Sequence, residues 1–287
     1  MTLIVHLSDT HFGTEVPAVV DALRHIVAAR KPDLIIVSGD ITQRARRREF
    51  DAARRFFQSL PTPALLVIPG NHDIPLFDLL ARGLFPYRNY CAALGRQSGT
   101  WFGGDVAVFG FNSTSPLRHT RGKLSPAHFK AMLKEAPPEP SRNCIRIGCV
   151  HQPLHTAWMQ DAHNRLIDVE ATAEQFSRHG FDLVLSGHVH VPYIATTRDS
   201  FPGLDRHFIL SGAGTATSYR TRPGAPNSFN FIETGSHRGD AEVGITLCRF
   251  DEEQGAFSEN PPYRFRRVQD GWEEVPLDAE SIAARNG

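Results

Sequence analysis

Five short runs rich in Val, Ile and Leu each end beside an Asp, an Asn or a His. A run of this kind, apolar on both faces, is typical of a strand buried inside an α/β protein. In such proteins the polar residues that follow the carboxyl ends of parallel strands meet at one edge of the sheet. The sequence therefore predicts that several strands bring polar side chains to a common site. The runs are LIVHLS, DLIIVS, ALLVIP, CIRIGCV and FDLVLS.

Strand and helix patterns alternate through the first part of the chain. Residues 3–7, 34–37 and 65–68 have the pattern of strands, and apolar residues recur at helical spacing over 16–27 and 50–60. Such alternation predicts mostly parallel strands joined by helices. The same signals predict further strands and helices at 106–111, 126–135, 145–150, 171–178 and 183–185.

Two later regions depart from this rhythm. Residues 75–98 are expected to form an irregular helical excursion over the strand ends. After Pro192 successive strands are separated by turns, which predicts a second, more antiparallel sheet packed on the first within one domain of residues 1–250. Residues 251–287 are polar, and we expect an extension that packs on the domain or is partly disordered.

The charge balance bears on the partners of the chain. Lys and Arg together number 31, as do Asp and Glu, so the formal net charge is zero. Proteins that bind nucleic acid or anionic membranes electrostatically are normally basic, so the balance argues against both partners.

The four cysteines lack the CxxC spacing of metal or redox motifs, and the N-terminus lacks a signal-peptide pattern. We therefore expect a cytoplasmic protein with reduced thiols.

Short motifs of oxygen and nitrogen donors follow the apolar runs. Asp9 and His11 are two residues apart, as are His188 and His190, so the members of each pair are expected on one side of an extended chain. Asp40 follows a glycine, which allows a close approach of the backbone. Carboxylates and imidazoles without thiolates suit Mn, Fe, Zn, Co or Ni.

The motif Gly70-Asn71-His72-Asp73 adds a different chemistry. Asn71 offers a neutral carbonyl ligand, which leaves the neighbouring His72 free for proton transfer. Asp73 is a candidate to hold the imidazole in one tautomer, and a plain turn or cap role is an equal alternative. His151 follows a further apolar run and completes the set of donors.

Taken together, these motifs resemble the signature of the calcineurin-like metallophosphoesterase superfamily, in residue type, order and approximate spacing over residues 3–190. The length and the compact Gly-Asn-His-Asp form resemble the bacterial class III cyclic-nucleotide phosphodiesterases. The resemblance implies a four-layer αββα sandwich of two mixed β-sheets flanked by helices. A Gln at position 152 departs from relatives that often carry a second His there.

The resemblance also implies a role for each residue. One metal ion would be held by Asp9, His11, Asp40 and His190. The other would be held by Asp40, Asn71, His151 and His188, with Asp40 bridging. His72 would contact the phosphate and assist the leaving oxygen. The implied cofactors are two divalent or trivalent transition-metal ions, with Mn or Fe favoured over Zn.

We therefore expect a metal-dependent phosphoesterase that hydrolyses a small phosphodiester, with a 3',5'-cyclic nucleotide as a candidate. Metal-activated hydroxide would attack phosphorus in line, and His72 would protonate the leaving oxygen. The alternatives are a phosphomonoesterase or nuclease on the same scaffold and, from another class, a non-catalytic interaction scaffold. A homodimer through residues 75–98 or the late strands is a further candidate.

The substrate-binding residues are harder to predict. Arg44 is close enough to Asp40 in sequence to reach a phosphate, and Asn112 ends another strand on the same expected edge. Arg220 and Tyr219 follow the glycine-rich segment 211–217, which we expect to form a turn beside the pocket. We therefore predict substrate contacts from Arg44, Asn112 and Arg220.

Overall fold

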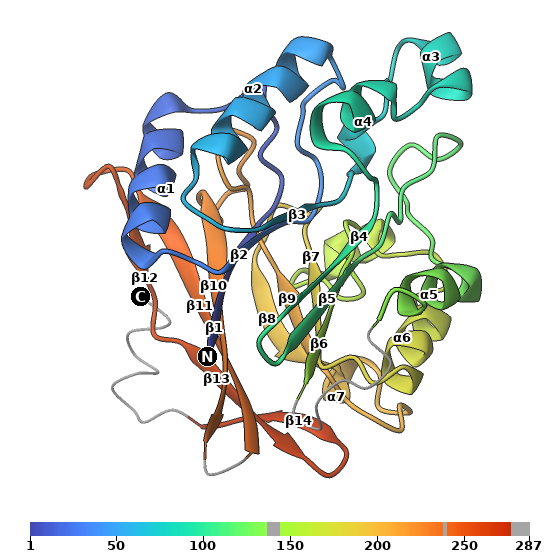
Figure 1. Cartoon of the computed structure of the whole chain (residues 1–287), viewed down its shortest axis with the longest axis vertical. Helices are drawn as coiled ribbons and strands as arrows, with labels where there is room; N and C mark the ends of the chain where they lie inside the picture. The colour runs from blue at the N-terminus through green and yellow to red at the C-terminus, as the bar shows by residue number, and fades with distance from the viewer. Residues whose placement is uncertain (137–143, 238–239, 277–287) are drawn as a thin grey trace.

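Two mixed β-sheets form the centre of the molecule (Figure 1). The computed structural model describes residues 1–136, 144–237 and 240–276. The first sheet has eight strands in the order β14-β13-β11-β10-β1-β2-β3, with β12 paired to β11. Its strands are β1 (Thr2–Leu7), β2 (Leu34–Val37), β3 (Leu65–Val67), β10 (Ser228–His237), β11 (Asp240–Asp251), β12 (Ala256–Glu259), β13 (Tyr263–Val268) and β14 (Gly271–Glu274).

The second sheet has six strands in the order β4-β5-β6-β7-β9-β8. Strands β5, β6, β7 and β9 are parallel, whereas β4 and β8 run antiparallel at the two edges. The bounds are β4 (Gly99–Gly103), β5 (Val106–Gly110), β6 (Ile145–Cys149), β7 (Leu183–Ser186), β8 (Tyr193–Thr196) and β9 (Ile209–Gly212).

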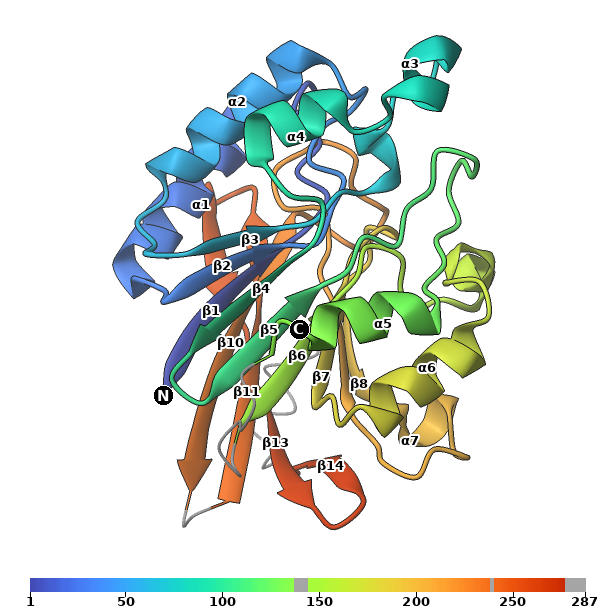
Figure 2. The ribbon, with the colours of Figure 1, turned by 45° about the vertical axis from the view of Figure 1, so that its right-hand side comes forward.

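Helices cover the outer face of each sheet, which gives the expected four layers (Figures 1 and 2). On the first sheet lie α1 (Pro17–Arg30), α2 (Arg47–Ser59) and α4 (Arg88–Leu94), and on the second lie α5 (Pro126–Leu133) and α6 (Val169–Arg178). The shorter helical segments are η1 (Asn71–Asp73), α3 (Leu79–Leu84), η2 (Met159–Asn164) and α7 (Thr197–Ser200). Among the described residues, no helix is both long enough and apolar enough to cross a membrane.

Successive side chains of a strand point to opposite faces of the sheet, and this alternation explains the layers. In β2, Leu34 and Ile36 pack between the two sheets, whereas Ile35 and Val37 pack against the helices of the first sheet. Residues of β5 to β7 complete the layer between the sheets, and a cluster of phenylalanines from β5, α5 and α6 fills the space under the outer helices of the second sheet. Both faces of the central strands are therefore buried, as the apolar runs predict.

The division of strands between the sheets differs from the prediction. The expectation that the strands after Pro192 form a sheet of their own is wrong, because β10 and β11 join β1 in the first sheet while β8 and β9 join β7 in the second. Val5, for example, pairs with Phe231. The local pattern of β1 or of β10 cannot predict that these two strands pair, because they lie far apart in the sequence. Residues 256–274 add three strands to the first sheet, and residues 277–287 lie outside the described residues.

Candidate metal centre

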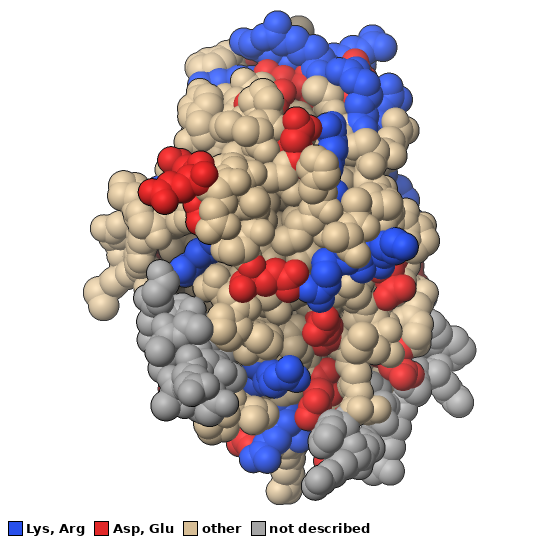
Figure 3. All heavy atoms as spheres, turned by 90° about the vertical axis from the view of Figure 1, so that its left-hand side faces the viewer, with Lys and Arg blue, Asp and Glu red and all other residues tan. Residues whose placement is uncertain are grey.

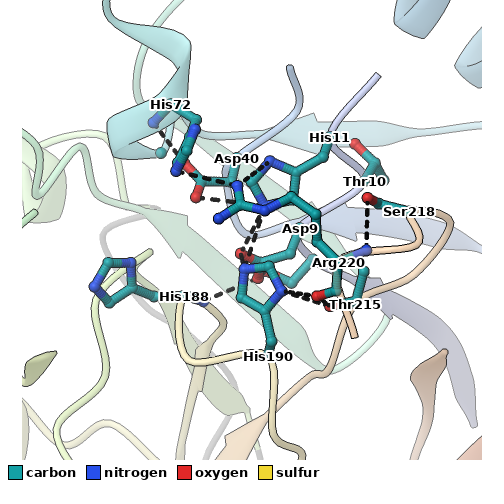
Figure 4. A network of polar contacts seen from close by, with 12 residues as sticks. Asp9, Thr10, His11, Asp40, His72, His188, His190, Thr215, Ser218 and Arg220 are labelled. Atoms are coloured by element: carbon teal, nitrogen blue, oxygen red, sulfur yellow. Dashed lines mark hydrogen bonds and ion pairs between the residues drawn. The ribbon is translucent and has the colours of Figure 1, made fainter. Parts of the chain in front are cut away.

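The carboxyl ends of five strands bring the predicted donors together. Asp9 and His11 follow β1, Asp40 follows β2, and Asn71 follows β3. From the second sheet, His151 follows β6, and the loop after β7 carries His188 and His190. The site therefore lies where the strand ends of both sheets meet, and Figure 4 shows several of these side chains pointing toward one another.

The first group consists of Asp9, His11 and His190, all buried. Nε2 of His190 lies 3.3 Å from Oδ1 of Asp9, and Nε2 of His11 lies 3.6 Å from the same oxygen. The two Nε2 atoms are 3.3 Å apart. Three donor atoms that lie within 4.8 Å of one another form the kind of cluster that holds a metal ion.

The second group consists of Asp40, His151 and His188. Oδ1 of Asp40 lies 3.3 Å from Nε2 of His151, which in turn lies 3.1 Å from Oδ1 of Asn71. The other oxygen of Asp40, Oδ2, lies 3.8 Å from Nε2 of His11 in the first group. Asp40 therefore has one oxygen on each side and is placed to bridge two ions.

Unsatisfied polar atoms support the fit of a metal ion. Within the described part of the chain, Oδ1 of Asp9 and both ring nitrogens of His188 are buried without a hydrogen-bond partner. Leaving such atoms unpaired away from water costs about 1–3 kcal/mol each. Ligation of a cation would satisfy Asp9 and one nitrogen of His188, so the residues present fit the metal ions that the sequence resemblance implies.

Backbone strain is concentrated at the same residues. A positive φ outside glycine occurs at eight described positions, and five of these are Asp9, His11, Asp40, His188 and His190. The left-handed region costs a residue with a β-carbon on the order of 1 kcal/mol or more. Strain of this kind persists only where the surroundings hold it in place. Its concentration on the donors supports a functional reason for their orientation.

Glycines allow the segments of the site to approach one another. A β-carbon at Gly70 would lie 2.1 Å from the backbone nitrogen of Asp40, and one at Gly187 would lie 2.4 Å from Oδ2 of Asp9. Neither contact is possible for a side chain. The glycines of the Gly-Asn-His-Asp and Gly-His motifs therefore permit the close packing that places Asp9 and Asp40.

Hydrogen bonds fix the orientation of two imidazoles. Nδ1 of His151 lies 2.8 Å from the carbonyl oxygen of Ser38, and Nδ1 of His190 lies 2.7 Å from Oγ1 of Thr215 and beside the carbonyl oxygen of Arg220. Because Nδ1 donates to these oxygens, Nε2 is left as the ligand atom in each ring. Ser38 and Thr215 were not predicted to take part in the site, although Thr215 lies in the glycine-rich segment expected beside the pocket.

Burial and charge set the pKa of the candidate ligands. Burial lowers the pKa of His11 to about 4 and that of His188 to about 3, so both rings are neutral at pH 7. Burial also disfavours the charged form of His151, but the Asp40 carboxylate outweighs it and raises the pKa of His151 to about 9. Burial acts to raise the pKa of Asp9, yet His190 and the other nearby histidines hold it well below its usual range.

His72 lies at the edge of the metal groups, and its ring is oriented by a residue that we did not predict. Nδ1 of His72 lies 3.0 Å from the backbone carbonyl oxygen of Gln43. Asp73 instead accepts hydrogen bonds from the backbone nitrogens of Gly70, Ile41 and Thr42 at 2.8–3.1 Å. Asp73 therefore has the turn role that was the alternative, and the structure does not bring its carboxylate to the His72 ring.

The three residues that were predicted to contact the substrate lie at different distances from the metal groups. Nη1 of Arg220 lies 3.0 Å from Oε1 of Gln43 and 3.3 Å from Nε2 of His72, inside the metal pocket. Arg44 lies over the ring of Phe77, with 5.2 Å to its centroid, beside a small hollow that Asn71 and His72 also line. Asn112 bonds to Gln97 and Thr114 and lines a separate pocket, so it is not brought to the metal groups.

The pocket above the metal groups has a volume of about 480 Å³. Such a volume suits a small ligand. The floor includes Asp40, Asn71 and His188, and one wall is the segment Tyr219–Arg222. Thr120, Asn164 and Arg222 also line it, although none of them was predicted to contact the substrate. These residues come from loops whose sequences carry no motif.

Comparison with known proteins agrees with this geometry. The model of the calcineurin-like phosphoesterase family matches residues 2–192, which include every candidate ligand. The chain is also similar to a glycerophosphodiester phosphodiesterase, GpdQ, from Enterobacter lignolyticus (strain SCF1). The two are 37% identical over 82 residues, which is 25% of this chain and 29% of that protein. The chain thus matches less than a third of the length of this relative.

Solved structures share the fold at low sequence identity. Purple acid phosphatase PPD1 from yellow lupin (Lupinus luteus) seeds is 11% identical with a TM-score of 0.67, over 97% of this chain and 57% of that one. A dimetal phosphatase from Danio rerio is 10% identical with a TM-score of 0.57, over 85% and 95% of the two chains. These identities confirm the fold alone. On the strength of the family match, which spans both candidate metal groups, the chain belongs to the calcineurin-like phosphoesterase family.

Proposed function

We propose that the protein is a dinuclear-metal-dependent phosphodiesterase that hydrolyses a small phosphodiester. The observation that carries this proposal is the pair of donor groups that share Asp40, with His72 and Arg220 facing the same pocket. When bound, two such cations acidify water and offset negative charge on phosphate oxygens. Asp9, His11, Asp40 and His190 would hold one ion, and Asp40, Asn71, His151 and His188 the other.

The side chains around the ions have separate tasks. Because Nδ1 of His72 donates to the carbonyl of Gln43, Nε2 faces the pocket, where it can hold the proton that the leaving oxygen requires. The guanidinium of Arg220, close to Nε2, can neutralise a non-bridging phosphate oxygen through charge-assisted hydrogen bonds. This arrangement needs no protein nucleophile.

Two considerations favour a diester over a monoester. The relative GpdQ is a phosphodiesterase by name. A diester also carries an organic group on each of two phosphate oxygens. The pocket offers neutral groups such as Thr120 and Asn164, beside its arginines, to contact them. A phosphomonoesterase or nuclease remains the alternative, and a cyclic nucleotide is one diester that would fit the volume.

We propose Mn or Fe as the native metals and the cytoplasm as the location.

A paired hydrolysis assay tests the proposal. The protein is supplied with Mn²⁺ and either bis-p-nitrophenyl phosphate or p-nitrophenyl phosphate, and Asp40→Ala provides the background. We expect faster turnover of the diester and a loss of at least about a hundredfold in the variant. Faster turnover of the monoester would assign a phosphatase instead. Turnover that survives in Asp40→Ala would reject the site.

A further inference from the structure

Large apolar side chains are exposed together beside the metal pocket. Most come from the segment that leads from η1 through α3, and one comes from the loop before Thr120. Each of them is at least 60% exposed, and together we call them the apolar rim: Phe77, Leu79, Leu80, Leu84, Phe85 and Leu117. Isolated exposed apolar residues are common, but a cluster of this size marks a surface that contacts another apolar phase.

The apolar rim is held in place by hydrogen bonds. Arg82 of α3 donates from Nε to the carbonyl oxygen of Pro116 at 2.7 Å and from Nη2 to that of Arg118 at 2.8 Å. Tyr87 and Thr114 join the same two segments at 2.7 Å. Helix α3 and the loop that carries Leu117 therefore form one surface, which projects from the body of the molecule in Figures 1 and 2.

The fold itself gives no reason for the apolar residues of α3. None of the six residues Leu79–Leu84, all of them in the described part of the chain, is buried. A helix this short is not stable on its own propensity and normally forms because one face packs on the protein. Here its leucines face outward, so nothing in the described part of the chain buries them, and contact with another apolar phase would do so.

The charge around the apolar rim is positive. Residues 74–90 and 111–123 contain Arg82, Arg88, Arg118 and Arg121 against one acidic residue, Asp78, and a lysine, Lys123, that is paired with Asp168. Arg44 adds a further guanidinium over the ring of Phe77. Figure 3 shows the side of the molecule that faces away from α3; there Lys and Arg gather at the end where α2 lies, and the rest of that side is mixed. The zero net charge of the chain conceals this local excess.

The apolar rim adjoins the metal pocket. Leu76, next to Phe77, lines a hollow together with His72 and His119. Thr120, which follows His119, lines the metal pocket itself. An amphiphile whose phosphate lies on the metal groups would thus have its apolar part directed along Leu76 toward the apolar rim.

We propose that the apolar rim docks the protein on an anionic lipid surface, and that its substrates are phosphodiesters presented there. This inference rests on the proposed function. A short apolar segment with arginines around it is the composition that binds such surfaces, since apolar burial and attraction to anionic head groups act together. A second copy of the chain fits less well, because a self-complementary contact would bring the arginines of two copies together.

The expectation from net charge pointed away from membranes. Net charge is a property of the whole chain, whereas docking depends on the charge of the face that meets the lipid. The gathering of apolar and basic residues on one face is visible only after folding, because the rim combines segments whose bonded residues lie 34 and 36 positions apart in the sequence.

Sedimentation with vesicles tests the proposal on the full chain with Mn²⁺. Vesicles of phosphatidylcholine with phosphatidylglycerol are compared with phosphatidylcholine alone. The variants are Leu79→Ser with Leu80→Ser and, as a control, Met159→Ser, which changes an apolar residue outside the rim that is more exposed than either leucine. Turnover is measured on p-nitrophenyl hexadecyl phosphate in the vesicles and on bis-p-nitrophenyl phosphate in solution.

We expect binding to the anionic vesicles only, with an affinity that falls about tenfold or more in the double variant. The double variant should lose turnover of the vesicle-bound diester and keep that of the soluble diester, whereas Met159→Ser should behave as the unchanged protein. Absence of binding, or equal binding by the double variant, would overturn the inference. So would a dimer in solution that the double variant dissociates, because the rim would then meet a second copy.

The two proposals fail in different ways. If the unchanged protein binds anionic vesicles but hydrolyses neither diester, the proposed function is wrong and the docking surface stands. If it hydrolyses the soluble diester with metal but ignores vesicles, the docking surface is wrong and the phosphodiesterase stands.

Discussion

Nη1 of Arg220 lies 3.3 Å from Nε2 of His72, so the guanidinium and the imidazole face the same point of the metal pocket (Figure 4). Nδ1 of His72 is already used in its bond to Gln43, which leaves Nε2 as the acceptor of the Arg220 hydrogen bond. A phosphate that enters the pocket provides a better, charged acceptor for Arg220. We expect the guanidinium to turn to the substrate and so free Nε2 of His72.

Replacement of Arg220 by Met should therefore impair the use of the substrate. Hydrogen bonds to charged groups contribute about 1.5–3 kcal/mol, so kcat/KM for bis-p-nitrophenyl phosphate should fall about 10–100-fold. Metal content should not change, because the backbone carbonyl of residue 220 still accepts from His190. Arg220→Lys should restore part of the activity, and an unchanged kcat/KM in Arg220→Met would contradict the role.

Replacement of Gly187 by Ala should destabilise the protein. The new β-carbon would lie 1.7 Å from Oγ of Ser8 and 2.4 Å from Oδ2 of Asp9, so both side chains would have to move. We expect the free energy of unfolding to fall by about 1–3 kcal/mol and metal affinity to weaken. Thermal unfolding and metal titration measure the two effects. Gly203→Ala is the matched control, since nothing lies within 4 Å of its β-carbon, and equal behaviour of the two variants would reject this explanation.

Metal binding should depend on pH through His151. Its pKa is raised to about 9 by the Asp40 carboxylate in spite of burial, so the metal-free ring carries a proton at pH 7. A metal ion must displace that proton from Nε2, and affinity should therefore rise with pH up to about 9. Calorimetry in buffers of different ionisation enthalpy should find about one proton released per chain at pH 7. An affinity that does not change between pH 6 and pH 9 would count against this protonation state.

The cysteines should differ strongly in their reactivity. Cys91 is exposed, whereas Cys149 and Cys248 are buried, and burial raises the pKa of both buried thiols. Since the thiolate is the reactive form, a disulfide reagent at pH 8 should modify Cys91 quickly and the two buried thiols only after unfolding. Cys91→Ser should remove the fast phase. Fast modification of Cys149 in the folded protein would show that the layer between the sheets opens.

The sequence predicted the donors better than it predicted their surroundings. Asp9, His11, Asp40 and His151 each follow an apolar run, and the strand pattern alone indicates that such residues meet at one edge. The distribution of strands was not predictable, because the pairing of Val5 with Phe231 depends on contacts that neither local pattern contains. Local signals decide that a strand forms, and tertiary packing decides its neighbour.

The direction in which a side chain points also could not be predicted from the local sequence pattern. Asn112 ends a strand of the second sheet as expected, but its side chain turns to Gln97 and Thr114. Asp73 is adjacent to His72, yet its oxygens face the backbone of Ile41 and Thr42. In both cases nearby donors that come from other segments decide the orientation, and a single motif cannot show them.

The number of metal ions bound by each chain tests the central claim most directly. Asp40 has one oxygen toward each donor group, so both ions depend on it. Elemental analysis after dialysis against Mn²⁺ should find two ions per chain in the unchanged protein and fewer than one in Asp40→Ala. Asn71→Ala, which removes a donor from the second group alone, should retain about one ion. A single ion in the unchanged protein, or two in Asp40→Ala, would contradict a dinuclear centre bridged by Asp40.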